Sequence, residues 1–228
     1  MKIYEYGEEN PECILLIHPS LVTWDYFENV IPLLEEHYHL LIPAIPGYDL
    51  KDDSQFSTVE KVASQLADEL LQKGIREVKA IYGCSMGGSI VLRMAADGKL
   101  KAQHYVMDGG ITPYQLLLIL TRLIALRDFG MMALGKLGGE RLIVKAFSSS
   151  QYSEEDLKYV ANIFRHCTYK TLWNTSRGGQ YAFNGIFGNC FLRCDGIDAD
   201  LSRGIYSGQQ VFLFCSKGSE RSADPERS

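Results

Sequence analysis

In the first 110 residues, short apolar runs alternate with stretches in which apolar residues recur every three or four positions. The short runs are almost continuously hydrophobic, as is typical of strands that are buried on both faces of a sheet. They cover residues 13–19, 39–47, 78–85 and 103–110. Because helical patterns separate them, the sequence predicts an α/β fold with a mainly parallel, doubly wound sheet.

Two helices are predicted between these strands. The first covers residues 57–74, where Ser57 and Glu60 have the spacing of a capping box and Gly74 stands at the expected C-terminal end. The second covers residues 86–98 and begins directly after Ser85. Gly83 and Gly87 each stand two positions from this serine. Both helices are expected to pack against the sheet.

Beyond this core the rhythm changes, and helical patterns follow one another without a strand between them. They cover residues 113–129, 131–147 and 153–167. Because their apolar positions recur at helical spacing, they are expected to bury one face each. We interpret residues 111–174 as an all-helical cap inserted over a sheet core formed by residues 1–110.

The composition changes again in residues 175–228. Glycine, serine and arginine are frequent, histidine is absent, and three of the six cysteines fall here. Residues 209–215 predict one more strand, and residues 216–228 are typical of a disordered segment. The C-terminal part of the core is therefore expected to be incomplete, as in a chain that is truncated or shifted in reading frame near residues 174–178.

Composition and charge narrow the choice of partners. The formal net charge is −5 and no run of Lys or Arg occurs, which disfavours nucleic acid and anionic membranes. The longest apolar run, residues 114–126, contains Arg122 and is too short to cross a bilayer. The polar N-terminus lacks a signal-peptide pattern, and the close pair Cys190 and Cys194 has no neighbouring histidine. We therefore expect reduced thiols, a cytoplasmic location, no metal and no cofactor.

The stretch Gly83-Cys84-Ser85-Met86-Gly87 matches G-x-S-x-G between a predicted strand and a predicted helix. The serine of such a turn has a strained backbone, and a side chain at either glycine would collide with neighbouring backbone. The turn places the Ser85 hydroxyl at a helix N-terminus, whose dipole favours a developing oxyanion. Ser85 is therefore the candidate nucleophile, and the backbone N–H of Met86 is one candidate oxyanion donor.

Two other interpretations of this stretch are open. Serine and glycine are common residues, so the same pentapeptide also occurs in strand-to-helix turns that carry no chemistry. Cys84 is the other possible nucleophile, but the alternation of side chains along a strand directs it into the core.

The order of these parts resembles the α/β-hydrolase fold family over about residues 1–174. LLIHPS, which ends at Ser20, resembles the strand and turn that supply the second oxyanion donor; LIPAIPGYD resembles the family's strand that ends in Pro-Gly, and IYGCSMGGSIVLRMA its elbow. Pro19 stands where the family has glycine, and proline has no N–H. The resemblance thus implies Ser20 N–H as the second donor, with Leu21 next, and a loop-shaping role for His18.

The base that would activate the serine is the missing part. The family order is nucleophile, acid and then histidine, so the resemblance implies a late histidine, yet none follows His166. His37, His39 and His104 precede or open strands and are expected at the end of the sheet opposite the elbow. His166, on the third cap helix, is the remaining candidate base.

Asp108 is the candidate acid, because it ends the strand after the elbow. The alternative is that its carboxylate hydrogen bonds the loop amides of Gly109 and Gly110. The sequence thus predicts a serine hydrolase that acts on a small ester, thioester or amide through an acyl-enzyme on Ser85. A missing histidine would lower its rate by several orders of magnitude.

Two other functions stay open. One is a catalytically inactive hydrolase-fold protein that binds a small apolar ligand under the cap, with residues 116–120 and 131–134 lining the groove. The other is a lyase or haloperoxidase-type enzyme with the same elbow. The fold supports many chemistries, so the sequence leaves the substrate beyond a small acyl compound open.

Overall fold

The computed structural model describes residues 1–108, 118–147, 153–181 and 213–216. Strands of these residues form one sheet in the order β1-β3-β2-β4-β5-β6. The four central strands run parallel, and the edge strands β1 and β6 run antiparallel to their neighbours. This confirms the predicted mainly parallel sheet. The strands are β1 (Ile3–Tyr6), β2 (Cys13–Ile17), β3 (His39–Pro43), β4 (Glu77–Cys84), β5 (Lys101–Asp108) and β6 (Leu213–Ser216).

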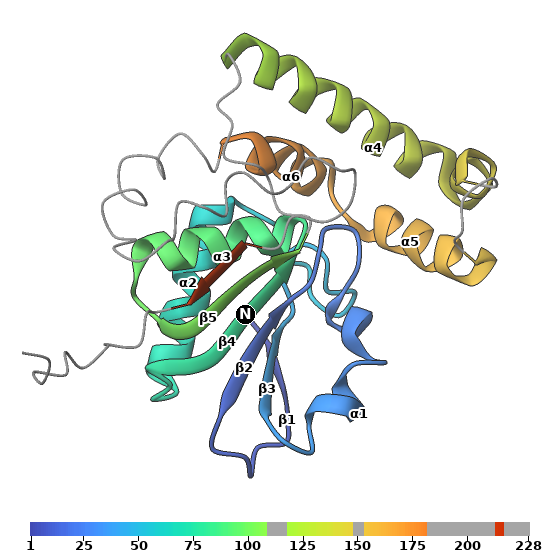
Figure 1. Ribbon diagram of the computed structural model, residues 1–228. Coiled ribbons are helices and arrows are strands. Elements are labelled where there is room, and N and C mark those ends of the chain that lie inside the picture. Colours follow the sequence, from blue (N-terminus) through green and yellow to red (C-terminus); the bar gives the residue numbers. More distant parts are fainter. Residues whose placement is uncertain (109–117, 148–152, 182–212, 217–228) are drawn as a thin grey trace, which may run out of the picture.

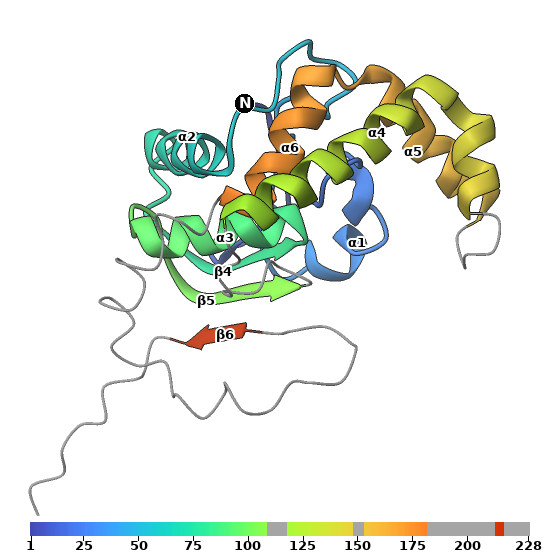
Figure 2. The same ribbon diagram turned by 90° about the horizontal axis from the view of Figure 1, so that it is seen from above.

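Helices cover both faces of the sheet and its upper end. Figure 1 shows α2 and α3 on one side of the sheet and α1 on the other, with α4, α5 and α6 gathered beyond the strand ends. The view from above shows α4 lying across α6 and next to α5 (Figure 2). The helices are the 3₁₀ helix η1 (Trp24–Phe27), α1 (Ile31–Leu34), α2 (Val59–Gln72), α3 (Met86–Asp97), α4 (Leu118–Phe147), α5 (Glu154–His166) and α6 (Tyr169–Tyr181).

The two faces of the sheet carry separate hydrophobic cores. Leu15 and Ile17 of β2 belong to the larger core, which includes the inner faces of α2 and α3. Leu16, between them, belongs to the smaller core with Phe27 and Ile31. Since successive side chains of a strand point to opposite faces, only a continuous apolar run can fill both cores. This is the physical reason that β2 reads as an unbroken hydrophobic segment.

The first predicted helix is confirmed, but its N-cap is shifted by one residue. The backbone of Thr58 is extended, and its side chain accepts a hydrogen bond from Lys61 N–H at 3.3 Å. The expectation of Ser57 as cap was wrong, because neighbouring hydroxyls compete and the backbone conformation decides between them. At the other end Gly74 has φ 85°, and the N–H groups of Gly74 and Ile75 bond to the last helical carbonyls.

The cap contains a longer helix than its sequence predicts. Residues 113–129 and 131–147 were expected to be separate helices, but α4 is helical through Gly130. Its one non-helical residue is Gly139, with φ 58° and ψ −157°. Glycine inside a helix lowers the stability of the helix by only about 1 kcal/mol relative to alanine, so packing against neighbouring helices can compensate for it.

Helix α6 was not predicted. It extends from Tyr169 to Tyr181 and therefore crosses the change in composition near residue 175. Its polar side chains bind the loop that follows β3: Thr171 Oγ1 accepts from Phe56 N–H at 3.3 Å, and Asn174 Nδ2 donates to the Phe56 carbonyl at 2.9 Å. These tertiary bonds compensate for a sequence in which Thr, Asn, Ser and Gly are weak helix formers.

Both ends of the chain contribute edge strands. The N-terminal segment, which the sequence analysis described as polar, contains β1. This strand pairs with β3 from Ile3↔Pro43 to Tyr6↔Leu40. β6 overlaps the strand expected at residues 209–215 and pairs with β5. It extends to Ser216, which was expected to be the first residue of the disordered segment. The expected disorder of residues 217–228 concerns residues that lie outside the described ranges.

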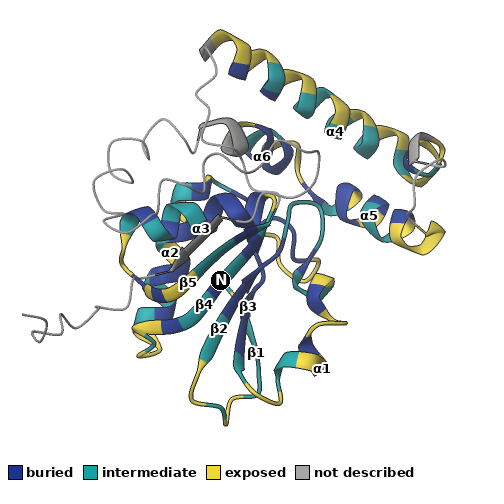
Figure 3. Cartoon of the chain, in the orientation of Figure 1, coloured by how far each residue is buried: buried dark blue, intermediate teal, exposed yellow. Residues whose placement is uncertain are grey.

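The outer side of α4 is exposed (Figure 3). Ile119 is 75% exposed and Leu137 is 73% exposed. Leu120, Met131 and Leu134, expected to line a groove under the cap, are exposed as well. None of the helices in the described residues combines the length and the apolar character that crossing a bilayer requires.

Candidate active site

Ser85 stands at a sharp turn between β4 and α3. Its backbone has φ 51° and ψ −112°, a conformation that L-residues rarely adopt, and its side chain is exposed. A Cβ on Gly83 would lie 2.3 Å from the carbonyl oxygen of Gly87, and a Cβ on Gly87 would lie 2.3 Å from that of Ile17. The expected collision at both glycines is confirmed. The chain therefore keeps glycine here because the strand, the helix and the end of β2 touch backbone to backbone.

The turn after β2 lies next to this elbow. The position of a Gly87 Cβ is also 3.0 Å from the carbonyl oxygen of His18, at the start of that turn. Among the described residues, Leu21 and Ser85 are the two with positive φ that are not glycine. Strained backbone of this kind costs about 1–3 kcal/mol and clusters at functional sites. Two such residues on adjoining turns mark this edge of the sheet as the candidate site.

Three backbone N–H groups are candidates for binding an oxyanion at this site. Met86 is the first residue of α3, so its N–H has no partner within the helix. Ser20 and Leu21 lie in the turn after β2, and their N–H groups make no hydrogen bond to the described residues. The candidate donors Met86 and Ser20, and the alternative Leu21, thus belong to two neighbouring turns.

His18 is fully buried and holds the turn after β2 in place. Its Nδ1 lies 2.8 Å from the Pro19 carbonyl oxygen, and its Nε2 lies 3.2 Å from Ile45 N. A carbonyl can only accept and an amide can only donate, so Nδ1 carries the proton and Nε2 is the acceptor. Burial lowers the pKa of His18 to about 4. A neutral ring with both nitrogens bound fits the loop-shaping role that the resemblance implied.

Asp108 ends β5 directly beside the elbow. Its carbonyl oxygen accepts from Ser85 N–H at 2.7 Å, and its carboxylate Oδ2 accepts from the Tyr82 hydroxyl at 2.8 Å. Burial, and after it the bond to Asp108, raise the pKa of Tyr82, which therefore stays a donor. The alternative partners Gly109 and Gly110 lie outside the described residues. The backbone of Asp108 thus contacts Ser85, whereas its carboxylate is bound to Tyr82.

Cys84 is half-buried, so it is less deeply placed than strand alternation predicts. Its Sγ lies 4.0 Å from the hydroxyl of Tyr26, on the same face of the sheet as Tyr82. Burial raises the pKa of the Cys84 thiol. Since the thiolate is the nucleophilic form, the raised pKa disfavours Cys84 as the nucleophile.

No histidine hydrogen bonds to Ser85 within the described ranges 1–108, 118–147, 153–181 and 213–216. His39 binds the carboxylate of Glu5 at 2.9 Å, at the start of β3, and His104 is an exposed residue of β5. His166 is the last residue of α5 and is half-buried. Asp52 has a lowered pKa, mainly through hydrogen bonds from Ser54, and His166 contributes a smaller charge effect. No hydrogen bond or ion pair of the described residues joins His166 to Ser85.

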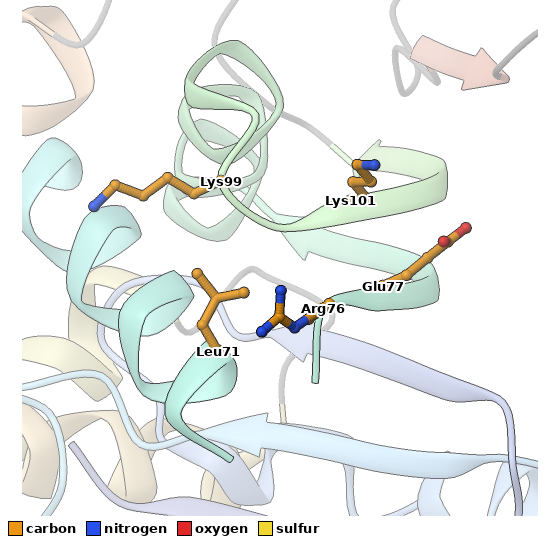
Figure 4. Close-up of a pocket in the computed structure, with 5 residues that line it drawn as sticks. All are labelled: Leu71, Arg76, Glu77, Lys99 and Lys101. Atoms are coloured by element: carbon orange, nitrogen blue, oxygen red, sulfur yellow. The ribbon is translucent and has the colours of Figure 1, made fainter. Parts of the chain in front are cut away.

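Two further features concern other kinds of site. A hollow lined by Leu71, Arg76, Glu77, Lys99 and Lys101 lies at the starts of β4 and β5, away from the elbow at their ends (Figure 4). Lys99 binds Asp68 at 3.0 Å, so its charge is already paired. Within the described parts of the chain, His, Cys, Asp and Glu side chains form no cluster of three that could hold a metal ion.

The side chains that support the candidate site were missed in the sequence analysis. Tyr82 is one of them; strand alternation alone could have placed it on the face of Cys84 and, through the β4–β5 register, of Asp108. Tyr159, on α5, is another: its hydroxyl binds Thr23, which follows the turn after β2. Because 136 residues separate these two, only the tertiary structure reveals their contact.

The fold and the elbow place the chain among known proteins. The family model of the alpha/beta hydrolase fold matches residues 13–216. This chain belongs to the α/β-hydrolase fold family. An AB hydrolase superfamily protein of Gibberella zeae is 32% identical over 107 residues, which cover 46% of this chain and 38% of that protein. The chain therefore aligns with well under half of the length of that relative.

Solved structures share the fold. An α/β-hydrolase family protein from Desulfitobacterium hafniense is 24% identical with a TM-score of 0.61, over 78% of this chain and 72% of that one. An esterase from Exiguobacterium antarcticum is 15% identical with a TM-score of 0.59, over 78% of this chain and 68% of that one. At these identities the likeness concerns the fold alone.

Proposed function

We propose that this chain is a serine hydrolase that acts on a small ester, thioester or amide. One observation carries the proposal: Ser85 and Leu21, the two strained non-glycine residues of the described chain, lie on adjoining turns at the ends of β4 and β2. Strain maintained in both turns is expected where backbone geometry serves chemistry. The esterase among the structural neighbours supports the class of reaction.

In the proposed reaction, Ser85 Oγ attacks the substrate carbonyl carbon. The carbonyl π pair moves onto oxygen, and that oxyanion accepts hydrogen bonds from Met86 N–H and Ser20 N–H. Collapse of this intermediate expels the alcohol, thiol or amine and leaves an acyl group on Ser85. Water then attacks the acyl-enzyme and releases the acid. A base takes the serine proton and passes it to the leaving group, then takes a proton from the attacking water and returns it to Ser85 Oγ when the acid leaves; His166 is the candidate for this base.

Labelling with a fluorophosphonate probe tests the nucleophile. We expect the wild-type chain to be labelled and Ser85→Ala to be unlabelled. Ser89→Ala is the matched control, because Ser89 lies in the first turn of α3, is 2% exposed, and its hydroxyl binds none of the described residues. Labelling that persists in Ser85→Ala, or its absence from a wild-type chain shown to be folded, contradicts the proposal.

A second function is favoured by one observation, namely that no histidine of the described residues binds Ser85. In this alternative the chain is an inactive hydrolase-fold protein that binds a small apolar ligand under its cap. Binding of a fluorescent fatty-acyl probe that is equal in the wild type and in Ser85→Ala, together with absent fluorophosphonate labelling, supports it.

We further propose a small acyl compound as the partner and the cytoplasm as the location.

A further inference from the structure

A phenol of the cap hydrogen bonds to the segment that follows the turn after β2. The hydroxyl of Tyr159, in the second turn of α5, accepts a hydrogen bond from Thr23 N–H at 2.9 Å and donates one to Asp25 Oδ1 at 2.5 Å. Thr23 Oγ1 donates to the same carboxylate oxygen at 2.5 Å. One hydroxyl group thus closes a small network of the cap and the core.

The chemistry of this network fixes the direction of each bond. An amide N–H can only donate and a carboxylate can only accept, so the phenol uses one lone pair and its proton at once. Burial, and after it the bond to Asp25, raise the pKa of Tyr159 to about 12, so the phenol keeps its proton at neutral pH. Bonds to a carboxylate are stronger than neutral ones. Thr23 is 4% exposed, so water offers its amide little alternative.

The position of Thr23 makes this attachment more than a docking contact. Thr23 follows the strained Leu21 by two residues and is the N-cap of η1. The 3₁₀ helix η1 in turn contacts the elbow strand: Phe27 packs edge-on against Tyr82, and the Tyr26 hydroxyl lies 4.0 Å from Cys84 Sγ. A group that fixes Thr23 therefore fixes the turn before it and the helix after it.

We propose that Tyr159 is a positioning residue that holds the turn of Ser20 and Leu21 in its strained conformation from the cap. This inference rests on the proposed function, because the N–H groups of that turn are the candidate oxyanion donors. A Leu residue at positive φ has a strained backbone, and the bonds to the phenol oppose its relaxation. The order of the oxyanion turn therefore depends on a docked cap.

The test compares Tyr159→Phe, which removes only the hydroxyl, with the wild type. Tyr169→Phe is the matched control: Tyr169 also lies in the cap, at the start of α6, and its ring is exposed. NMR on the full chain measures amide hydrogen exchange for Thr23 and the backbone chemical shifts of Ser20 and Leu21, which report on φ and ψ. Fluorophosphonate labelling over a range of probe concentrations separates probe affinity from the maximal labelling rate.

We expect Tyr159→Phe to raise the exchange rate of the Thr23 amide by about tenfold, as the loss of one buried hydrogen bond predicts, and to change the backbone chemical shifts of Ser20 and Leu21. We expect its maximal labelling rate to fall by about tenfold with little change in probe affinity, and Tyr169→Phe to match the wild type. If Tyr159→Phe fails to fold, Asp25→Ala removes the acceptor that orients the phenol and is assayed in the same way.

Two results overturn the inference. One is a set of Ser20 and Leu21 chemical shifts that is the same in Tyr159→Phe as in Tyr169→Phe; the other is a change in these shifts with an unchanged maximal labelling rate. An unlabelled wild-type chain would contradict the proposed function instead. In that case the chemical shifts of Ser20 and Leu21 alone decide whether Tyr159 orders the turn.

Discussion

The elbow and the cap helix α4 both contain glycines, but the glycines do different things. At the elbow, a methyl group on Gly87 would lie 2.3 Å from the Ile17 carbonyl oxygen. In α4, a methyl group on Gly130 would have no atom within 4 Å. The elbow glycines are thus required by close contacts of backbone, whereas Gly130 fills a place that alanine would fill better. The comparison shows that glycine is required where close contacts or a positive φ exclude a side chain, and not where it merely lies within a helix.

The largest expected effect comes from filling the elbow. Gly87→Ala places its methyl group against the end of β2, and neither backbone can move without shifting a core strand. We expect a loss of at least about 3 kcal/mol in the free energy of unfolding, or a chain that does not fold. Urea denaturation followed by circular dichroism measures it. A variant as stable as the wild type would remove the basis of the comparison.

The turn beside the elbow is predicted to make stability pH-dependent. The pKa of His18 is lowered by burial to about 4, against about 6.5 in the unfolded chain. Between pH 6.5 and 4, His18 binds a proton in the unfolded chain but not in the folded chain. The contribution of His18 to the free energy of unfolding is therefore fully present above pH 6.5 and is lost as the pH falls towards 4. Between pH 7.5 and 5 the loss is about 2 kcal/mol.

Urea denaturation at the two pH values tests this expectation. His18→Gln is the comparison, since it lacks the titrating ring, and its stability is expected to change less with pH by about 2 kcal/mol. Parallel changes in the two proteins would show that other groups cause the pH dependence.

A smaller effect is expected where α4 breaks. Gly139 has φ 58° and ψ −157°, a region that is essentially restricted to glycine, although its methyl position is open. Gly139→Ala should therefore lower the free energy of unfolding by about 1–2 kcal/mol through backbone strain alone. Thermal denaturation measures the change. An unchanged midpoint would mean that α4 can pass through this residue in ordinary helical conformation.

The smallest effect has the opposite sign. Gly130→Ala replaces a helical glycine whose surroundings are open, and it should stabilise the chain by about 0.5–1 kcal/mol. The same denaturation assay serves, and the contrast with Gly87→Ala is the sharpest form of the comparison. Destabilisation by Gly130→Ala would indicate that its place in α4 is more restricted than its contacts imply.

The sequence alone predicted the elements whose signals are local. A strand buried on both sides needs an unbroken apolar run, so β2, β3 and β4 were identifiable. The turn at Ser85 needs glycine at both flanking positions, so the elbow was recognisable as well. In the cap, by contrast, glycine spacing suggested a break at residue 130, but the helix breaks at Gly139. The sequence does not distinguish a glycine that lies within a helix from a glycine at which the helix ends.

What only the tertiary structure decided are contacts between distant parts of the chain. Thr58 rather than Ser57 caps α2, α6 is helical because its side chains bind the loop after β3, and Tyr159 reaches Thr23 across 136 residues. Each depends on a partner brought close by folding. The sequence by itself determined the nucleophile elbow, because backbone strain restricts which residues can stand there. The partners of that elbow leave no such mark, because many side chains can donate or accept a hydrogen bond and only folding selects one.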